Sequence, residues 1–364
     1  MLYIPKTTDD LTPEFLTDVV RTRYPGVTVQ DFHIDEVKRF GEIMVSTSDR
    51  LKLTLNLSDN APADLPRRVA VKLKRSTDEN LTALYGTEIN FYVRIQPEVS
   101  IQSPHSLGGL IDPETSLYYL LLEDLSLRNA RFPNATTPVS LDEVRAILDQ
   151  FAKLHAQFWN SPRFKADLSW YEVHGSGFLF DFFRTALPFI IGQDVAVNPL
   201  KQELIAGLGT TLDELFAGFV ALQRWQSSQL PQTLLHGDGH VGNTYLLPDG
   251  TAGLLDFQLS SRGAYAHDVN YLILTALDTE TRRANERGLL RYYLDALKRE
   301  GVASPPDDEE AWTEYRRGIL WSFYVGWLTT PIGNYGEAIN RANLTRIATA
   351  YEDLETGKLI DEIR

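Results

Sequence analysis

Three oxygen-bearing side chains flank one predicted β-hairpin, and they constrain the fold of this chain more than any other feature. Two short apolar runs surround a Pro-Asp-Gly turn, at residues 244–247 and 251–255. A hairpin folds back on itself, so Asn243 at its start and Asp256 at its end are predicted to lie close together. Asp238 stands on the loop just before the hairpin. The sequence therefore predicts that the three side chains converge.

The chemistry of these side chains suits a magnesium ion. Mg²⁺ prefers oxygen ligands and is usually held by one or two carboxylates together with substrate phosphates. The kinase catalytic loop H-R-D-x-x-x-x-N has the same interval between its Asp and Asn, and a metal-binding Asp follows it. Here the loop is His236-Gly237-Asp238, with Gly in place of Arg. His-Gly-Asp is also common in turns, so the specificity comes from the combination with Asn243 and Asp256.

The first half of the chain supplies a strand lysine and a helix glutamate. The β-branched run 69–72 ends in Lys72, in the form of the third-strand lysine that reaches the ATP phosphates in protein kinases. Lys74 shares its face of the strand; either lysine fits this contact, and the Val-Ala-Val-Lys pattern favours Lys72. Residues 84–92 predict a helix in which Glu88 is available to pair with that lysine. The alternative is that Glu88 is a solvated helix residue.

Two further segments are candidates for nucleotide contacts. Residues 39–55 form two strand-like stretches around a small-residue turn, in the position of a phosphate-covering loop. They lack G-x-G-x-x-G, so backbone amides and the hydroxyls of Ser46 and Thr47 would replace the glycines; an ordinary hairpin is equally compatible. Later, an apolar strand runs into acidic residues, and the backbone from Glu123 to Leu125 offers hydrogen bonds to an adenine. The alternative is a core strand that ends at the surface.

In this order, the features resemble the aminoglycoside phosphotransferase and choline kinase superfamily, whose members have a protein-kinase-like fold but phosphorylate small molecules. The likeness is greatest to the ecdysteroid kinase-like branch. It is carried by the motifs Leu-Glu-Asp-Leu, Leu-His-Ala-Gln-Phe-Trp, His-Gly-Asp and Asp-Phe-Gln, at residues 122–125, 154–159, 236–238 and 256–258. Asp-Phe-Gln in place of Asp-Phe-Gly, and the lack of a later Ala-Pro-Glu segment, argue against a protein kinase.

The resemblance implies an α+β, protein-kinase-like fold of two lobes. Residues 1–125 would form a nucleotide-binding N-lobe with a small antiparallel β-sheet. Residues 126–364 would form a larger, mainly helical C-lobe that carries the catalytic loop and the substrate-binding helices.

The resemblance also implies roles for the residues that match the motifs. Asp238 would be the catalytic base, and Asn243 and Asp256 would be Mg²⁺ ligands. Lys72 would bind the α- and β-phosphates, and Glu88 would orient Lys72.

Three more residues are predicted to support the site. His236 would stabilise the loop by hydrogen bonding rather than act on substrate. Asp268 matches a family residue that steadies the catalytic loop; a helix N-cap is the other interpretation of its position, and the two roles are compatible. His155 lies on the apolar face of a long helix predicted to start at the capping box of Ser140 and Glu143. It is predicted to be a hydrogen-bonded core residue.

The predicted activity is Mg²⁺-dependent transfer of the γ-phosphoryl group of ATP, with GTP as an open alternative, to a hydroxyl of a small molecule. Aromatic residues concentrate in the second half of the chain. Most are predicted to be core, and some to line a pocket for an apolar or ring-bearing alcohol. The alternatives are an aminoglycoside or macrolide phosphotransferase, and an inactive nucleotide-binding pseudokinase. The intact set of motif residues argues against the pseudokinase.

Composition sets the remaining bounds. With 43% hydrophobic and 23% charged residues over 364 positions, the chain is typical of a globular protein of two domains or lobes. It contains no cysteine, which excludes disulfides, a thiol nucleophile and zinc-thiolate sites. A formal charge of -14 disfavours nucleic acid and anionic membranes as partners. No apolar run reaches the roughly 18 residues of a membrane span, and we expect a soluble cytoplasmic protein.

Overall fold

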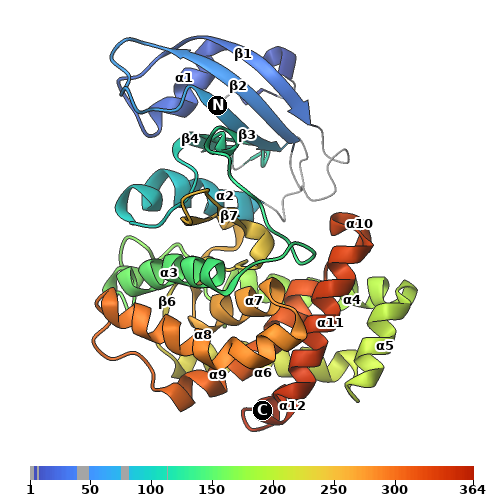
Figure 1. Cartoon of the computed structure of the whole chain (residues 1–364). Coiled ribbons are helices and arrows are strands. Elements are labelled where there is room, and N and C mark those ends of the chain that lie inside the picture. Colours follow the sequence, from blue (N-terminus) through green and yellow to red (C-terminus); the bar gives the residue numbers. More distant parts are fainter. Residues whose placement is uncertain (1–3, 6–7, 39–48, 75–81, 113) are drawn as a thin grey trace. The chain divides into compact units, whose positions relative to one another are not determined.

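The computed structural model describes residues 4–5, 8–38, 49–74, 82–112 and 114–364 (Figure 1). The chain divides into two compact units. The first unit comprises Met1–Ala130 and Leu255–Leu259, and the second comprises Arg131–Leu254 and Ser260–Arg364. The short segment around Asp256, which sequence order places in the second lobe, thus belongs to the first unit. The assignment of nucleotide and acceptor to the two parts stays a prediction.

The first unit is built on an antiparallel sheet of five strands in the order β1-β2-β3-β5-β4. The strands are β1 (Val29–Lys38), β2 (Asp49–Leu57), β3 (Arg68–Lys74), β4 (Ser106–Ile111) and β5 (Tyr118–Glu123). Side chains alternate between the faces of a strand, so the buried leucines and valines of β2 and β3 all lie on one face. That face packs against helix α1 (Pro13–Arg21) to form a continuous apolar core.

A local sequence signal explains where the first helix of this unit begins. Thr12 followed by Pro13 predicts a helix start, and helix α1 begins there: the Thr12 hydroxyl accepts a hydrogen bond from the Phe15 N–H, and Pro13 occupies the first helical position. Helix α2 (Thr82–Asn90) confirms the predicted helix and continues as a π-helix, Phe91–Ile95. In Figure 1, α1 and α2 lie on opposite sides of the sheet.

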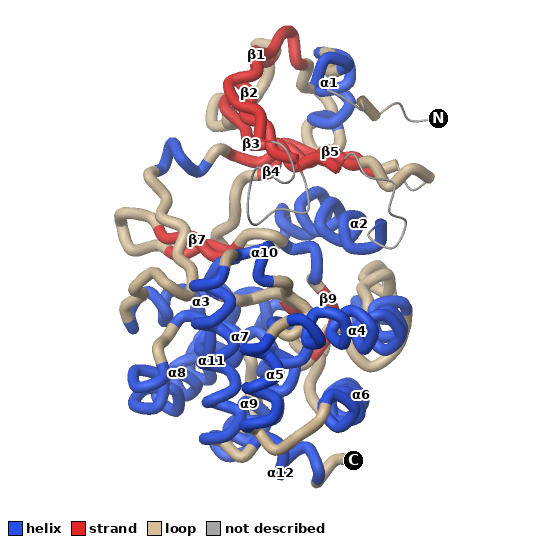
Figure 2. The backbone as a smooth tube through the Cα atoms, turned by 90° about the vertical axis from the view of Figure 1, so that its right-hand side faces the viewer, coloured by secondary structure: helices blue, strands red, loops and turns tan. Residues whose placement is uncertain are grey.

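The second unit is mainly helical, with two short strand pairs (Figure 2). Strand β6 (Thr233–Leu235) pairs with β9 (Ser261–Gly263), and β7 (Thr244–Leu246) pairs with β8 (Ala252–Leu254). The helices are α3 (Leu141–Gln157), α4 (Phe178–Val197), α5 (Pro199–Gly207), α6 (Leu212–Gln229), α7 (Ala266–Ala276), α8 (Thr279–Arg299), α9 (Asp308–Trp321), α10 (Ile332–Tyr335), α11 (Glu337–Asp353) and α12 (Thr356–Asp361). With the sheet of the first unit, this confirms the predicted α+β class.

Two predictions for the helices of the second unit are confirmed. The capping box of Ser140 and Glu143 starts α3. Four aromatic residues and one isoleucine recur at helical spacing, and all five are buried in the core, as predicted for most of the aromatic residues. They lie on α9 and its π-helical continuation Ser322–Trp327, at Trp312, Tyr315, Ile319, Phe323 and Trp327.

Helix α7 is the centre of the second unit, since every one of its residues is buried. Among the described helices, no single one has the length and apolar composition to cross a membrane; α5 and α6, bent by 71° from each other, pass that test only as a pair.

Candidate functional site

The first unit brings three charged side chains together on one face of its sheet. The Lys72 Nζ on β3 lies 2.6 Å from the Glu88 Oε1 on α2 and 3.2 Å from the Asp256 Oδ2. Glu88 is only 1% exposed, so the alternative that it is a solvated helix residue is wrong. The predicted lysine and glutamate therefore form an ion pair, and the predicted metal ligand Asp256 joins it.

Burial and charge oppose each other in this cluster. Burial raises the pKa of Glu88 to about 7, although the Lys72 ammonium counteracts the rise. Burial acts to lower the pKa of Lys72, but the carboxylates of Asp256 and Glu88 together raise it above its usual value. Lys72 is therefore a permanent cation near neutral pH.

Asp256 is fixed by its backbone and by its neighbour. It adopts a φ of 62°, in the left-handed region that few residues other than glycine occupy. The ring of Phe257 stacks on Phe91 with centroids 3.5 Å apart, and it meets Tyr92 edge-on. These contacts explain why residues 255–259 belong to the first unit, and they hold an uncommon backbone conformation at a predicted metal ligand.

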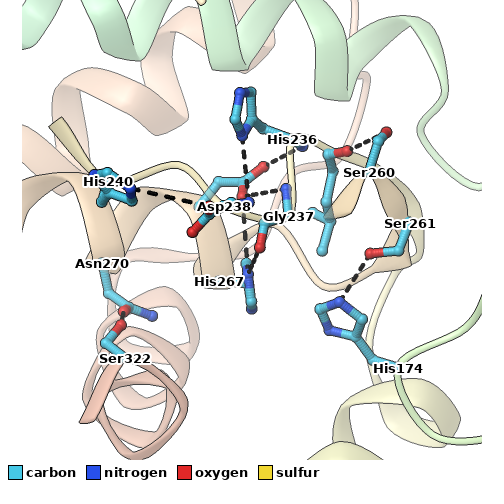
Figure 3. A network of polar contacts seen from close by, with 12 residues as sticks. His174, His236, Gly237, Asp238, His240, Ser260, Ser261, His267, Asn270 and Ser322 are labelled. Atoms are coloured by element: carbon cyan, nitrogen blue, oxygen red, sulfur yellow. Dashed lines mark hydrogen bonds and ion pairs between the residues drawn. The ribbon is translucent and has the colours of Figure 1, made fainter. Parts of the chain in front are cut away.

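In the second unit, Asp238 lies on a tight loop directly after β6 (Figure 3). Gly237 has a φ of 83°, a conformation that favours glycine and explains the departure from the His-Arg-Asp form of this loop. The Asp238 N–H donates to the Nδ1 of the buried His236 at 3.3 Å. The prediction that His236 supports the loop is thus consistent with its position.

Asn243 holds Asp238 from the other side. Its Nδ2 donates to both the backbone oxygen and the Oδ2 of Asp238, each at 2.9 Å. The predicted hairpin begins immediately after Asn243, with Thr244 paired opposite Leu254. The hairpin prediction is therefore confirmed, and its second strand ends just before the segment that contains Asp256.

Asp268 on helix α7 binds the backbone of the loop that carries Asp238. Its Oδ2 accepts the His236 N–H at 2.7 Å, its Oδ1 accepts the Gly237 N–H at 3.0 Å, and the His155 Nε2 lies 3.1 Å from Oδ2. Burial acts to raise the pKa of Asp268, but the hydrogen bond with His155 and electrostatic interactions with the histidines around it lower this pKa to about 2. The N-cap alternative is wrong, because Tyr265 occupies that position.

His155 has hydrogen-bond partners on both of its ring nitrogens. It is fully buried, and its other ring nitrogen, Nδ1, lies 2.6 Å from the Tyr293 hydroxyl. His155 is therefore a hydrogen-bonded core residue, as predicted.

One loop contact was not predicted from the sequence. The Nε2 of His267 lies 3.0 Å from the Gly237 carbonyl (Figure 3), and burial lowers the pKa of His267. The ring is thus neutral, and its Nε2–H donates to this oxygen. Two consecutive residues of α7, His267 and Asp268, therefore bind the carbonyl and the N–H of Gly237. The adjacency of His267 to Asp268 was the only signal for this role.

The other predicted nucleotide contacts have mixed outcomes. Ser46 and Thr47 lie outside the described residues, as does the side chain of Lys74. Glu123 ends β5, and its carboxylate accepts a hydrogen bond from the His105 N–H at 3.3 Å. Leu125 is buried at the start of a short 3₁₀ helix. Base recognition by Glu123 and Leu125 stays a prediction.

Aromatic side chains surround the histidine next to Asp238. The His240 Nε2 lies 3.9 Å from the Asp238 Oδ2, and the His240 ring meets those of Tyr271, Trp327 and Tyr335 edge-on, at centroid distances of 5.6, 6.0 and 6.0 Å. The Trp327 and Tyr335 rings are 5.3 Å apart. We call these four residues the aromatic cluster.

The two predicted metal ligands, Asn243 and Asp256, each offer oxygen atoms, the donors that magnesium prefers. In the described residues, no three His, Cys, Asp or Glu side chains are grouped as for a metal held by protein alone. Magnesium does not need such a group, because phosphate oxygens and waters complete its shell. Because the Asn243 Nδ2 is engaged by Asp238, its Oδ1 is the amide atom suited to a cation, and Asp256 offers a carboxylate.

The chain was compared with protein-family models, curated protein sequences and solved structures. The family model described as "Phosphotransferase enzyme family" matches residues 64–303. A choline kinase from Cryptosporidium parvum is similar in structure, with 12% identity, 90% of each chain covered and a TM-score of 0.57. Choline kinase LicA from Streptococcus pneumoniae has 16% identity, coverage of 89% of this chain and 94% of that one, and a TM-score of 0.46.

A third similar structure is macrolide 2'-phosphotransferase MphH from Brachybacterium faecium. It has 14% identity, coverage of 91% of this chain and 97% of that one, and a TM-score of 0.44. At 12% identity, the likeness to the choline kinase from Cryptosporidium parvum concerns the fold alone. No curated protein sequence matches the chain.

Proposed function

The chain belongs to the phosphotransferase enzyme family, and from this premise we propose that it transfers the γ-phosphoryl group of ATP to a hydroxyl of a small molecule with the aid of Mg²⁺. The observation that carries the proposal is the restraint of Asp238 by Asn243 and, through its loop, by Asp268. The narrower placement in the ecdysteroid kinase-like branch stays a prediction.

Asp238 is proposed as the residue that aligns the acceptor hydroxyl and takes its proton. Its Oδ2 is occupied by the Asn243 amide, which fixes the orientation of the carboxylate. A fixed carboxylate on a rigid loop positions a hydroxyl without a large entropic cost at the moment of reaction. Phosphoryl transfer depends mainly on such positioning and on electrostatic stabilisation.

Lys72, Asn243 and Asp256 are proposed to meet the charge of the phosphates. Bound Mg²⁺ would neutralise charge on the phosphate oxygens, held by the Asn243 Oδ1 and the Asp256 carboxylate. Glu88 keeps the Lys72 ammonium in place through the ion pair of 2.6 Å. Lys72 would then contact the phosphates nearer the base, and the backbone from Glu123 to Leu125 would contact the base.

The proposed function predicts nucleotide binding followed by acceptor-dependent turnover. We expect Mg²⁺-ATP or Mg²⁺-GTP to raise the melting temperature, because a ligand that binds only the folded state stabilises it. ADP or GDP release should then rise with one acceptor class in a panel of choline, glycerol, an aminoglycoside, a macrolide and a ring-bearing alcohol. Stabilisation without turnover on any acceptor would indicate a pseudokinase, and no stabilisation by either nucleotide would reject the proposal.

The acceptor is proposed to be apolar or ring-bearing. The support is the aromatic cluster of His240, Tyr271, Trp327 and Tyr335, which lies in the same unit as Asp238 and beside its carboxylate. Aromatic rings bind flat apolar groups through area and edge-to-face contacts. Tyr335 is the member to test, because it is half-buried whereas the other three are buried.

Tyr335→Ala is expected to raise the KM for the acceptor about 10-fold, since a lost aromatic contact is worth about 1.4 kcal/mol. The KM for the nucleotide should not change, and Tyr335→Phe should behave like the wild type. Phe189→Ala, at a ring that is 66% exposed on α4, is the matched control. Steady-state kinetics with the acceptor found in the panel measure both constants. An unchanged acceptor KM in Tyr335→Ala would remove the cluster from the acceptor site.

A further inference from the structure

The sheet face that carries Lys72 also carries an arginine directly opposite it. In the antiparallel pairing of β2 and β3, Arg50 is aligned with Lys72. Residues directly opposite each other project to the same side of a sheet. The intervening Leu51 and Val71 are buried in the core on the other side, so Arg50 and Lys72 share the face on which Glu88 and Asp256 lie.

Among the side chains that the structure describes on this face, the other cations are paired with carboxylates. Lys52 and Arg68 each approach the Asp124 Oδ2 at 3.2 Å, and Lys72 is paired as described above. Within the described residues, Arg50 forms no salt bridge, and its side chain is exposed. Its positive charge nonetheless acts to lower the pKa of both Lys72 and Glu88, against the larger effects that raise these two pKa values. The Arg50 guanidinium thus interacts electrostatically with Lys72 and Glu88 without forming a salt bridge to a described carboxylate.

Lys72 is already engaged by carboxylates. Its ammonium lies within 3.2 Å of both Glu88 and Asp256, so its charge is shared with two acids. The sequence also lacks the glycine-rich pattern whose backbone amides cover phosphates in protein kinases. A further cation on this face would add positive charge that can bind the phosphates.

We propose that Arg50 binds the nucleotide phosphates from strand β2, opposite Lys72. A guanidinium is planar and always charged, and its forked donors match two phosphate oxygens. Lys72, by contrast, is held by its carboxylates and acts as a point charge. This inference rests on the proposed function, because it assigns a nucleoside triphosphate to this face of the first unit.

The test compares ligands that differ in their number of phosphates. Arg50→Gln should raise the Kd for Mg²⁺-ATP about 10-fold or more and that for ADP by less, and it should leave the Kd for adenosine unchanged. Arg50→Lys should fall between Arg50→Gln and the wild type, because it keeps the charge and loses the fork. If GTP is the bound nucleotide, then GTP, GDP and guanosine take the place of these ligands. Isothermal titration calorimetry of the full chain measures each affinity.

The matched control is Arg67→Gln, which removes the same charge at an exposed arginine just before β3. It should bind all three ligands like the wild type. Equal triphosphate affinities in Arg50→Gln and Arg67→Gln would overturn the role of Arg50 while leaving the proposed function intact. If the wild-type protein bound neither ATP nor GTP, the proposed function itself would be rejected, and the inference with it.

Discussion

Replacing Asp238 with asparagine is expected to lower kcat by about 10² to 10⁴-fold, the range that general base catalysis contributes. Asparagine keeps an oxygen that can accept the hydrogen bond from the Asn243 Nδ2, now 2.9 Å from the Asp238 Oδ2. The loop should therefore keep its shape, and only the proton acceptor is lost. The KM of the nucleotide and the melting temperature should stay near wild-type values. Acceptor-dependent ADP release and thermal denaturation measure these effects.

Asp249→Asn is the control for this variant. It makes the same change of side chain and charge at an exposed position in the turn of the following hairpin, and it should turn over like the wild type. Turnover within a few-fold of the wild type in Asp238→Asn would contradict the role of Asp238 as the base. A large loss of thermal stability would instead identify Asp238 as a structural residue.

The second large effect is expected at Asp268, on stability rather than on turnover alone. Both carboxylate oxygens accept backbone N–H groups, and the side chain is 0% exposed. In Asp268→Asn, the amide NH₂ would face one of these donors. Since each unsatisfied buried donor costs about 1–3 kcal/mol, we expect a loss of about 3 kcal/mol in the free energy of unfolding. Urea denaturation measures this loss, with Asp249→Asn again as the control.

The pH dependence gives the Asp268 prediction a second readout. The pKa of Asp268 is about 2, below its usual value of 3.8. Its ionised form therefore stabilises the folded chain above pH 4, and this contribution of about 2 kcal/mol is lost as pH falls through 2. The stability difference between wild type and Asp268→Asn should accordingly be constant above pH 4 and shrink in more acid solution. A difference that does not depend on pH would contradict this account of the carboxylate.

The elements set by neighbouring residues could be predicted from the sequence. The turn between Asn243 and Asp256 specified its hairpin, Thr12 and Pro13 specified the start of α1, and the capping box at Ser140 specified the start of α3. Each signal acts within a few residues, so no knowledge of tertiary packing was needed.

The features that depend on distant packing could not be predicted in this way. His267 acts on Gly237 only because α7 lies beneath the loop, and no local pattern marks a histidine for that contact. The N-cap alternative for Asp268 failed for the same reason, since its carboxylate serves a distant loop and not its own helix. The position of Arg50 opposite Lys72 depends on the register between β2 and β3, and no local motif in the sequence fixes this register.

The stacking of Phe257 in the first unit has a consequence for the order of folding. Residues 255–259 belong to a unit whose other members end at Ala130, so most of the second unit's sequence separates two parts of one core. During synthesis from the N-terminus, the surface formed by Phe91 and Tyr92 lacks its partner ring until that intervening stretch has emerged. Contacts so far apart in sequence slow folding, and an incomplete apolar surface is prone to aggregation. We therefore expect residues 1–130 expressed alone to be poorly soluble.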